Sequence, residues 1–321
     1  MTADLLLSQA IKVFLIARSA DSYSPSTLAQ YKWALDRFVL QQDKRIDEIN
    51  TSDIRQFLSY LQTDYEPVRP NGDASPLSSS SLFAAWKAIR AFYKWACPEF
   101  GIPNPSMKIP PPRHMASVIV PFVQDEIKSL LKACERTKLS TSTKKSFSMQ
   151  RPTYYRDRAI LLTLLDTGLR VSELCRLTIN DCNLQTGEII VNPFGSGIKS
   201  RSRIVPLGAS SRKAISIYLA HFPNIDKVPL FRKANEDALD RYNVLKMIVA
   251  LGERAGVRNV HPHRFRHTFG IMYLRNGGDL FTLQRLLGHT SLTMTQHYLA
   301  LAKSDDVAAH KKASPVDNWK L

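Results

Sequence analysis

Five prolines fall between Pro103 and Pro112, in the stretch GIPNPSMKIPPPRHMAS. Proline has no amide donor and biases the residue before it toward extended backbone, so no helix can cross this stretch. The chain has 321 residues, which is enough for two domains with separate cores. We therefore predict a first domain over residues 1–108, a semi-rigid proline-rich linker over 109–117 and a second domain over 118–321.

The segment before the prolines has the pattern of a small helical bundle. Apolar residues recur at helical spacing in SPSTLAQYKWALDRFVLQQ, TSDIRQFLSYLQTDY and SSSSLFAAWKAIRAFYKWAC. Ser24 or Ser26 is the expected N-cap of the first helix, and Thr51 or Ser52 that of the second. With an amphipathic N-terminal segment, this predicts a bundle of about four helices. The outward basic residues of the third stretch are Lys87, Arg90 and Lys94.

The segment after the prolines mixes helices with strands. VQDEIKSLLKAC and RDRAILLTLLDTG predict helices, and helices return from Ser210 to the end. Between those first two, STSTKKSFSMQRPTYY is polar and aperiodic, which predicts a surface loop. GEIIVNPFGSGIKSRSRIVPL alternates strand-like runs around two glycines and predicts a hairpin or a short sheet. The expected fold class is therefore mainly α with a small β-sheet in the second domain (α+β).

Charge points to a polyanionic partner. Lys and Arg number 44 against 28 Asp and Glu, a net charge of +16. Nucleic acid is favoured over an anionic membrane because no basic amphipathic anchor is evident. No apolar run approaches the ~20 residues of a membrane span, and the N-terminus lacks the basic region of a signal peptide. Four single cysteines without a CxxC pair are typical of a reducing cytoplasm, where we expect the protein to act.

A cluster of histidines lies near the C-terminus, where five of the eight fall between His261 and His297. A zinc site would need thiolate or carboxylate ligands as well. This segment contains no cysteine, its one carboxylate is Asp279, and Arg264 and Arg266 oppose a bound cation. We predict no metal and no other cofactor.

The same region suits a phosphate. On a helix that begins near His263, His263 and Arg266 share a face, and a guanidinium gives a phosphate two parallel N–H bonds. Arg170 follows a helix-ending glycine at the start of the next helix, where backbone amides favour an anion. Lys199 lies at a glycine-rich turn. Each of these sites has a structural alternative. His263 and Arg266 could form a basic surface turn, Arg170 could pair with Glu173 on a helix surface, and Lys199 could be a solvated loop lysine.

The stretch LLGHTSLTMTQHYL places His289 nine residues ahead of Tyr298. Taken alone, it fits a helix with a buried aromatic. Together, the successive motifs TGLRVSEL, GSGIKSRSRIVPL, HPHRFRHTF, LLGH and QHYL closely resemble the tyrosine recombinase (phage integrase) family, and most closely its compact Xer-like and transposon-integrase members. The resemblance covers the whole chain, as a helical core-binding (SAM-like) domain, a linker and a catalytic domain.

This resemblance implies site-specific DNA recombination through a 3′-phosphotyrosine intermediate. The implied nucleophile is Tyr298, the phosphate clamp Arg170 and Arg266, the general acid Lys199, and the remaining pocket residues His263 and His289. Neither metal nor nucleotide is needed, and the chain has no GxxxxGK[ST] loop or carboxylate cluster for Mg²⁺. The runner-up functions are strand relaxation by a type IB topoisomerase-like enzyme and a non-catalytic DNA architectural protein.

Three features depart from the family pattern. The segment 140–154 is longer than usual, and its Lys144, Lys145 and Arg151 are candidate DNA contacts. About two additional residues separate Lys199 from the following strand. Arg201 or Arg203 could therefore share its role or contact DNA. We expect no arm-binding domain before the bundle, which favours the simpler two-domain arrangement.

The implied partners are double-stranded DNA and further copies of the chain. We expect a homotetramer on two DNA sites, a monomer or weak dimer when free, no membrane association, and a prokaryotic nucleoid location when bound. By resemblance, the tail SDDVAAHKKASPVDNWKL docks on a neighbouring protomer, and the alternative is a frayed terminus.

Overall fold

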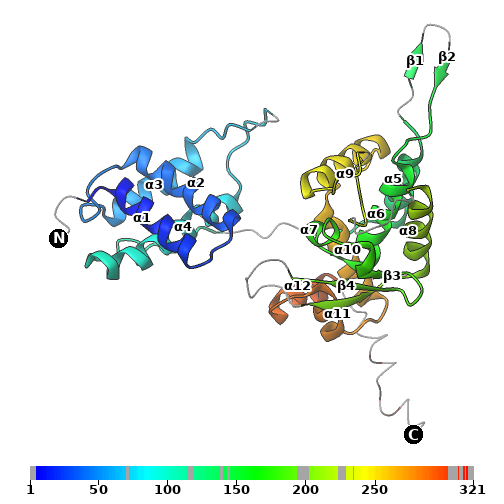
Figure 1. The fold of residues 1–321 in the computed structure, drawn as a ribbon. Coiled ribbons are helices and arrows are strands. Elements are labelled where there is room, and N and C mark those ends of the chain that lie inside the picture. Colours follow the sequence, from blue (N-terminus) through cyan, green and yellow to red (C-terminus); the bar gives the residue numbers. More distant parts are fainter. Residues whose placement is uncertain are drawn as a thin grey trace. The chain divides into compact units, whose positions relative to one another are not determined.

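The computed structural model describes residues 5–69, 72–113, 119–137, 140–142, 145–193, 202–222, 229–233, 235–302, 310, 314 and 316. The chain divides into two compact units, Met1–Ser117 and Val118–Leu321 (Figure 1). Each unit has its own hydrophobic core.

The first unit is a helical bundle, as predicted. Its helices are α1 (Leu7–Ala20), α2 (Pro25–Gln41), α3 (Thr51–Thr63) and α4 (Ser79–Phe100). The apolar stripe of each helix faces a shared interior, where burying the large side chains supplies the driving force for folding. Fully buried examples are Phe14, Leu35, Phe38, Phe57 and Phe92.

The starts of two helices test the predicted caps. Ser24 caps α2, and its hydroxyl accepts the amide of Thr27 at 3.2 Å. Helix α3 is capped by Asn50 instead of Thr51 or Ser52. The Asn50 side chain accepts two backbone amides, and the Asp53 carboxylate accepts the Asn50 amide at 3.0 Å. This reciprocal pairing satisfies more backbone donors than a hydroxyl one residue later would.

The proline-rich stretch stays attached to the first unit as far as Ile109. Ile109 is buried in the core of the bundle, and its carbonyl accepts the Trp86 indole N–H at 3.2 Å. The Thr51 hydroxyl likewise donates to the Pro105 carbonyl at 2.9 Å. The prediction began the linker at Ile109, because three prolines follow it. In the structure, Ile109 packs as part of the first unit.

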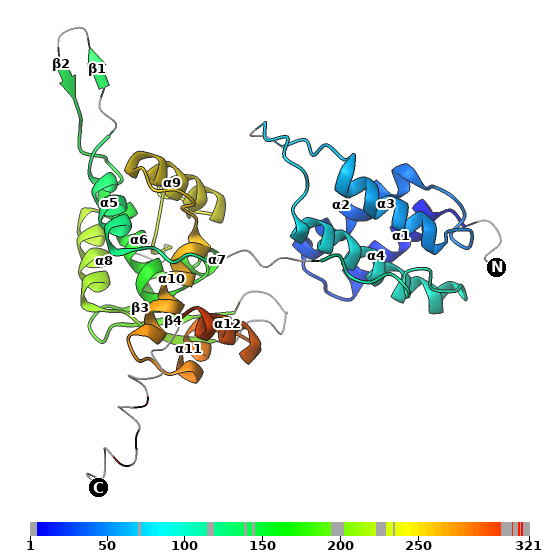
Figure 2. The same cartoon turned by 180° about the vertical axis from the view of Figure 1, so that it is seen from behind.

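The second unit combines helices with a three-stranded sheet, which confirms the predicted fold class. Its helices are α5 (Gln124–Glu135), α6 (Tyr154–Thr167), α7 (Val171–Leu174), α8 (Ala209–His221), α9 (Arg241–Ala255), α10 (Pro262–Arg275), α11 (Leu280–Leu287) and α12 (Leu292–Ala302). The strands of the sheet are β3 (Cys182–Asn183), β4 (Glu188–Val191) and β5 (Arg203–Pro206). Helices α6 and α8 pack side by side, as the reverse view shows (Figure 2).

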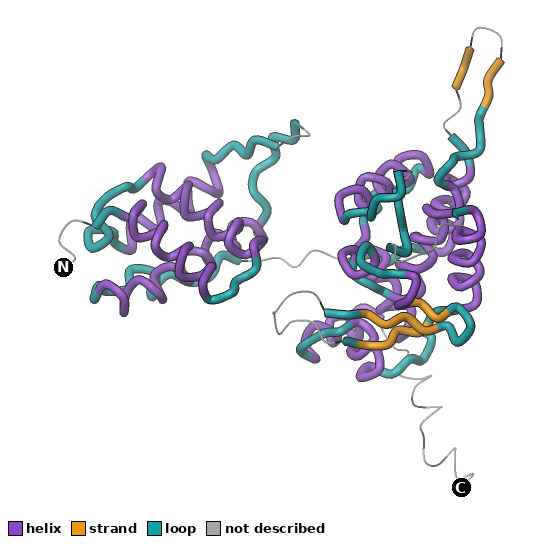
Figure 3. Tube along the Cα trace, viewed as in Figure 1, coloured by secondary structure: helices purple, strands orange, loops and turns teal. Residues whose placement is uncertain are grey.

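The sheet is antiparallel with the order β3-β4-β5 (Figure 3). Ile189 pairs with Val205, and the side chains of β4 alternate between exposed and buried. Ile189 and Val191 point into the core, as the period of two requires. Strand β5 contacts α11, which brings the sheet against the C-terminal helices.

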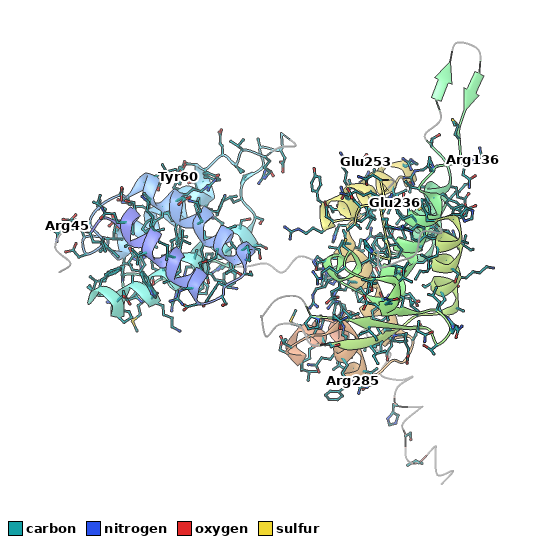
Figure 4. All side chains as sticks on the ribbon, viewed as in Figure 1. Arg45, Tyr60, Arg136, Glu236, Glu253 and Arg285 are labelled. Atoms are coloured by element: carbon teal, nitrogen blue, oxygen red, sulfur yellow. The ribbon has the colours of Figure 1, made fainter. Side chains whose placement is uncertain are left out.

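The segment predicted to be a surface loop contains an antiparallel ribbon instead. Strands β1 (Ser140–Ser142) and β2 (Lys145–Phe147) pair with Ser140 opposite Phe147. The Thr137 amide donates to the Met149 carbonyl at 2.8 Å and extends the pairing toward the base, where Arg136 lies (Figure 4). Backbone bonds make this ribbon, so the sequence shows none of the apolar alternation that marks a half-buried strand.

Among the described helices, none is both long and apolar enough to cross a lipid bilayer.

Candidate active site

Helix α10 carries the first group of site residues. Pro262 stands at its first position, and His261 caps it by accepting the Arg264 amide at 3.3 Å. The spacing of three and four residues then places Arg266 and His267 on the same side of the helix as His263. The rings of His263 and His267 have centroids 6.2 Å apart.

Arg266 is buried and ties together the ends of two helices. Its guanidinium donates to the carbonyls of Gly168 and Leu287, each at 2.7 Å. Gly168 ends α6 with a φ of 61°, and a Cβ there would lie 2.5 Å from the Phe269 ring. Burial and the nearby Arg170 charge lower the pKa of Arg266 to about 10, so it stays charged at neutral pH.

Arg170 is the N-cap residue of α7, the helix start predicted for it. Its guanidinium contacts the Glu173 carboxylate at 3.1 Å, and its side chain remains 30% exposed. The Arg170–Glu173 pair of the predicted alternative is therefore present, but it is not a surface pair, because the Glu173 side chain is buried while Arg170 stays partly exposed. Burial raises the pKa of Glu173, but Arg203 and Arg170 outweigh it and hold the pKa at about 2.

Arg203 has a different place from the one expected. Its side chain is 8% exposed, two of its nitrogens bind Glu173, and Nε donates to the Leu286 carbonyl at 2.8 Å. Gly288 packs on the guanidinium, since a Cβ there would lie 2.9 Å from Nη1. We therefore withdraw Arg203 as a DNA contact and as a general acid, because its donors serve the protein interior.

Helix α12 carries Tyr298 into the same region. Its side chain is 4% exposed, and its ring lies parallel to that of His289, with centroids 6.0 Å apart. The Thr295 hydroxyl fixes the His289 ring through Nδ1 at 3.0 Å. The ring of Tyr298 also packs on Gly270 of α10, where a Cβ would stand 3.2 Å from it. The buried-aromatic alternative thus describes the packing of Tyr298 but leaves out its polar neighbours.

His267 is a site residue that the local motifs did not single out. Its Nδ1 lies 2.9 Å from the Tyr298 hydroxyl. Two local signals point to it: it follows Arg266 directly, and it stands one helical turn after His263. The contact itself spans 31 residues and could not be seen in either local motif.

The protonation states follow from burial and positive charge. Burial lowers the pKa of His289 to about 4, helped by Arg266 and other cations. Burial and the neighbouring His263 lower the pKa of His267 to about 4 as well. Partial desolvation and Arg266 lower the pKa of His263. Burial raises the pKa of Tyr298, while Arg266 and Arg170 oppose that shift. At neutral pH the imidazoles of His267 and His289 are therefore uncharged.

The remaining predicted residues fall in three groups. Lys199, Arg201 and Lys144 lie outside the described residues, and only the backbone of Lys145 is described. Arg151 is an internal residue, because it pairs with buried Asp157 at 2.8 Å and donates to the Cys134 carbonyl. We therefore withdraw Arg151 as a DNA contact. The third group is exposed on α4 and comprises Lys87, Arg90 and Lys94.

Within the part of the chain that the structure describes, no three His, Cys, Asp or Glu residues are grouped so that they could hold a metal ion. Asp279, the carboxylate of the histidine-rich segment, caps α11 by accepting the Thr282 amide at 2.6 Å.

The model of the phage integrase family matches residues 122–305, and that of the phage integrase N-terminal SAM-like domain matches residues 11–99. The tyrosine recombinase XerC of Staphylococcus aureus is 30% identical over 302 residues, which cover 92% of each chain. Among solved structures, the integrase of transposon Tn1549 in complex with transposon right end DNA has a TM-score of 0.74 at 20% identity, over 97% of this chain and 99% of that one.

The XerH site-specific recombinase bound to its palindromic difH substrate has a TM-score of 0.66 at 20% identity, over 98% of this chain and 85% of that chain. These two structures support the fold, while the matching models and the XerC relative establish the family. The chain belongs to the tyrosine recombinase, or phage integrase, family of site-specific DNA recombinases.

Proposed function

We propose that this chain cuts and rejoins duplex DNA with Tyr298 as the nucleophile, through a 3′-phosphotyrosine intermediate. The observation that carries the proposal is the convergence of Tyr298, His289 and Arg266 from three separate segments. The rings of Tyr298 and His289 are parallel, and Arg266 opposes the rise that burial causes in the pKa of Tyr298. A buried aromatic with only a structural role would not need the charges of Arg266 and Arg170 near its hydroxyl.

Arg170 and Arg266 form the proposed phosphate clamp. Arg170 keeps an exposed guanidinium edge, and Arg266 is held rigidly by two backbone carbonyls. Donors that are fixed before the reaction stabilise negative charge that develops on the non-bridging oxygens in the transition state. The uncharged ring of His289, oriented by Thr295, adds a hydrogen-bond donor to the same pocket.

The tyrosine must lose its proton as it attacks. A phenol has a pKa near 10, and burial raises that of Tyr298 further, so a base or nearby positive charge is required. In the proposed step, the Tyr298 oxygen bonds to phosphorus, His263 accepts the phenolic proton, and the 5′-oxygen of the next nucleotide leaves. A 5′-hydroxyl of another strand then attacks the tyrosyl ester, so rejoining requires neither metal nor nucleotide.

Lys199 is proposed to protonate the departing 5′-oxygen. With Arg203 occupied in the interior, Arg201 is the remaining alternative for this role. A duplex with sulfur in place of the bridging 5′-oxygen decides between them, because a thiolate leaves without a proton. We expect the sulfur substrate to restore cleavage by Lys199→Ala but not by Arg170→Ala. If it instead restores cleavage by Arg201→Ala, then Arg201 is the acid.

The proposed partners are duplex DNA and further copies of this chain. Structural neighbours include the XerH complex with its DNA substrate and a lambda integrase dimer bound to a core site. We propose a tetramer on two sites, with the exposed basic face of α4 against the DNA backbone. We also propose that Lys144 and Lys145 contact DNA and that the C-terminal tail contacts a neighbouring protomer. The topoisomerase-like and architectural alternatives are not favoured, because the relatives are named as recombinases.

A covalent-adduct experiment tests the proposal. The site is first selected from a pool of random duplexes by binding, and is then prepared as a nicked duplex whose cleaved end diffuses away. We expect a protein–DNA adduct that resists denaturant with the wild-type chain and none with Tyr298→Phe. The matched control is Tyr273→Phe, a second tyrosine of the same unit, which should form the adduct normally. An adduct formed by Tyr298→Phe would overturn the assignment. Cleavage that depends on added Mg²⁺ would point to a nuclease.

A further inference from the structure

The hydroxyl of Tyr298 has a defined partner before any DNA is present. Nδ1 of His267 lies 2.9 Å from it, and the ring centroids are 5.6 Å apart. Tyr298 is buried, and His267 is partly buried. His267 is brought there by α10, the helix that also carries His263 and Arg266, so the contact is built into the scaffold of the site.

The ring contacts of Tyr298 do not by themselves fix the direction of its hydroxyl. The parallel His289 ring and the open face of Gly270 restrict the plane of the aromatic ring. Such apolar contacts still permit the ring to slide within that plane. A hydrogen bond at the hydroxyl removes this freedom, because it favours one distance and one direction.

We propose that His267 is a positioning residue for the nucleophile: its Nδ1 accepts the phenolic hydrogen of Tyr298 and holds the oxygen in place beside Arg266. This rests on the proposed function of Tyr298. The uncharged state of His267 supports it, since only a neutral imidazole has an acceptor nitrogen. The proton stays on the phenol in this resting arrangement, because an imidazole with so low a pKa is a weak base.

Three substitutions separate the hydrogen bond from the volume of the side chain. Asparagine branches at Cγ as histidine does, so His267→Asn keeps a hydrogen-bonding atom near the place of Nδ1. His267→Leu has the same branching without a polar atom. His267→Gln carries its amide farther out, near the place of the second ring nitrogen.

We expect the single-turnover cleavage rate at saturating DNA to fall about 10- to 100-fold in His267→Leu and His267→Gln, because small displacements of a reacting atom have effects of this size. His267→Asn should recover most of the rate. The dissociation constant for DNA should be unchanged in all three. Cleavage by His267→Leu at the wild-type rate would overturn the proposal, and so would equal impairment of His267→Asn and His267→Leu.

A double-mutant cycle in the DNA-free protein measures the contact without relying on catalysis. The thermal midpoints of Tyr298→Phe, His267→Leu and the double variant should be non-additive, since each single change removes the same bond. Additive shifts would overturn the proposal. A wild-type protein that forms no adduct would overturn the proposed function and this inference with it, whereas normal cleavage by His267→Leu overturns the inference alone.

Discussion

Arg203 binds both carboxylate oxygens of Glu173, at 3.1 and 2.8 Å, in the interior of the second unit. Its Nε also donates to the Leu286 carbonyl at the end of α11. One side chain of β5 thus joins the start of α7 to the turn that precedes His289. Because the negative end of a helix dipole attracts cations, Arg203 and Arg266 together hold this end of α11.

Arg203→Ala should destabilise the second unit strongly. It removes the bidentate partner of a buried carboxylate, and breaking a buried ion pair costs about 3–5 kcal/mol. Urea unfolding followed by circular dichroism measures the free energy of unfolding. The control is Lys32→Ala, which breaks an exposed pair with Asp36 and should cost about 1 kcal/mol or less. Equal losses in the two variants would contradict this account of Arg203.

Arg170→Ala and Arg266→Ala should differ in stability while both lose activity. Arg170 is partly exposed, and Glu173 keeps Arg203 when Arg170 is removed, so the free energy of unfolding should change by about 1 kcal/mol or less. Arg266→Ala leaves the Gly168 and Leu287 carbonyls without their buried donor and should cost more. Adduct formation should fall at least ~100-fold in both variants. An Arg170→Ala variant that is as unstable as Arg266→Ala would show that its role is structural.

Gly270→Ala should slow cleavage while leaving the fold intact. Gly270 lies inside α10, where alanine is preferred by about 1 kcal/mol. The new methyl group would stand 3.2 Å from the Tyr298 ring and push it by a few tenths of an ångström. We expect an unchanged or raised thermal midpoint together with a reduced single-turnover rate. A lower midpoint with normal cleavage would mean that the helix yields instead of the tyrosine.

Stability should fall as the pH drops from 6.5 toward 4. The pKa values of His267 and His289 are about 4 in the folded chain against an ordinary 6.5, so between these values the unfolded chain binds more protons. Each histidine therefore contributes a slope of up to about 1.4 kcal/mol per pH unit within this window, and its contribution is fully present above pH 6.5. Urea unfolding at pH 5.0 and 7.5 measures the effect. His267→Asn should show a smaller difference between the two pH values, and an unchanged difference would rule out the assigned shift.

The basic face of α4 should determine part of the salt dependence of DNA binding. Lys87 and Arg90 lie over the rings of Phe83 and Trp86, which hold their charges at the surface. Removing one cation that binds a phosphate should reduce the slope of log affinity against log salt by ~0.9. Titrations of Lys87→Ala, Arg90→Ala and Lys94→Ala measure this slope. Lys128→Ala, at an exposed position of α5 in the second unit, should leave the slope unchanged. If the α4 variants behave like Lys128→Ala, then α4 does not face DNA.

Local patterns predicted the helices well and supplied the catalytic candidates, whose roles stay predictions. Leu35 and Phe38 share one face of α2 because a helix repeats every 3.6 residues, and that apolar face is buried. Arg170 and Arg266 could be identified because each stands in a short motif, and these motifs follow one another along the chain in the order of the tyrosine recombinase family. The same local reasoning missed the β1–β2 ribbon, because backbone pairing leaves no apolar alternation in its sequence.

By itself, therefore, the sequence determined the fold class, the family and the candidate nucleophile Tyr298, since these depend on periodicity and on short motifs. Only the tertiary structure decided the partners of individual side chains. It turned Arg203 inward to Glu173, 30 residues away, and it placed His267 on the Tyr298 hydroxyl, 31 residues away. Contacts between segments so far apart depend on how helices pack and on which charges must be buried in pairs, and no local spacing encodes either.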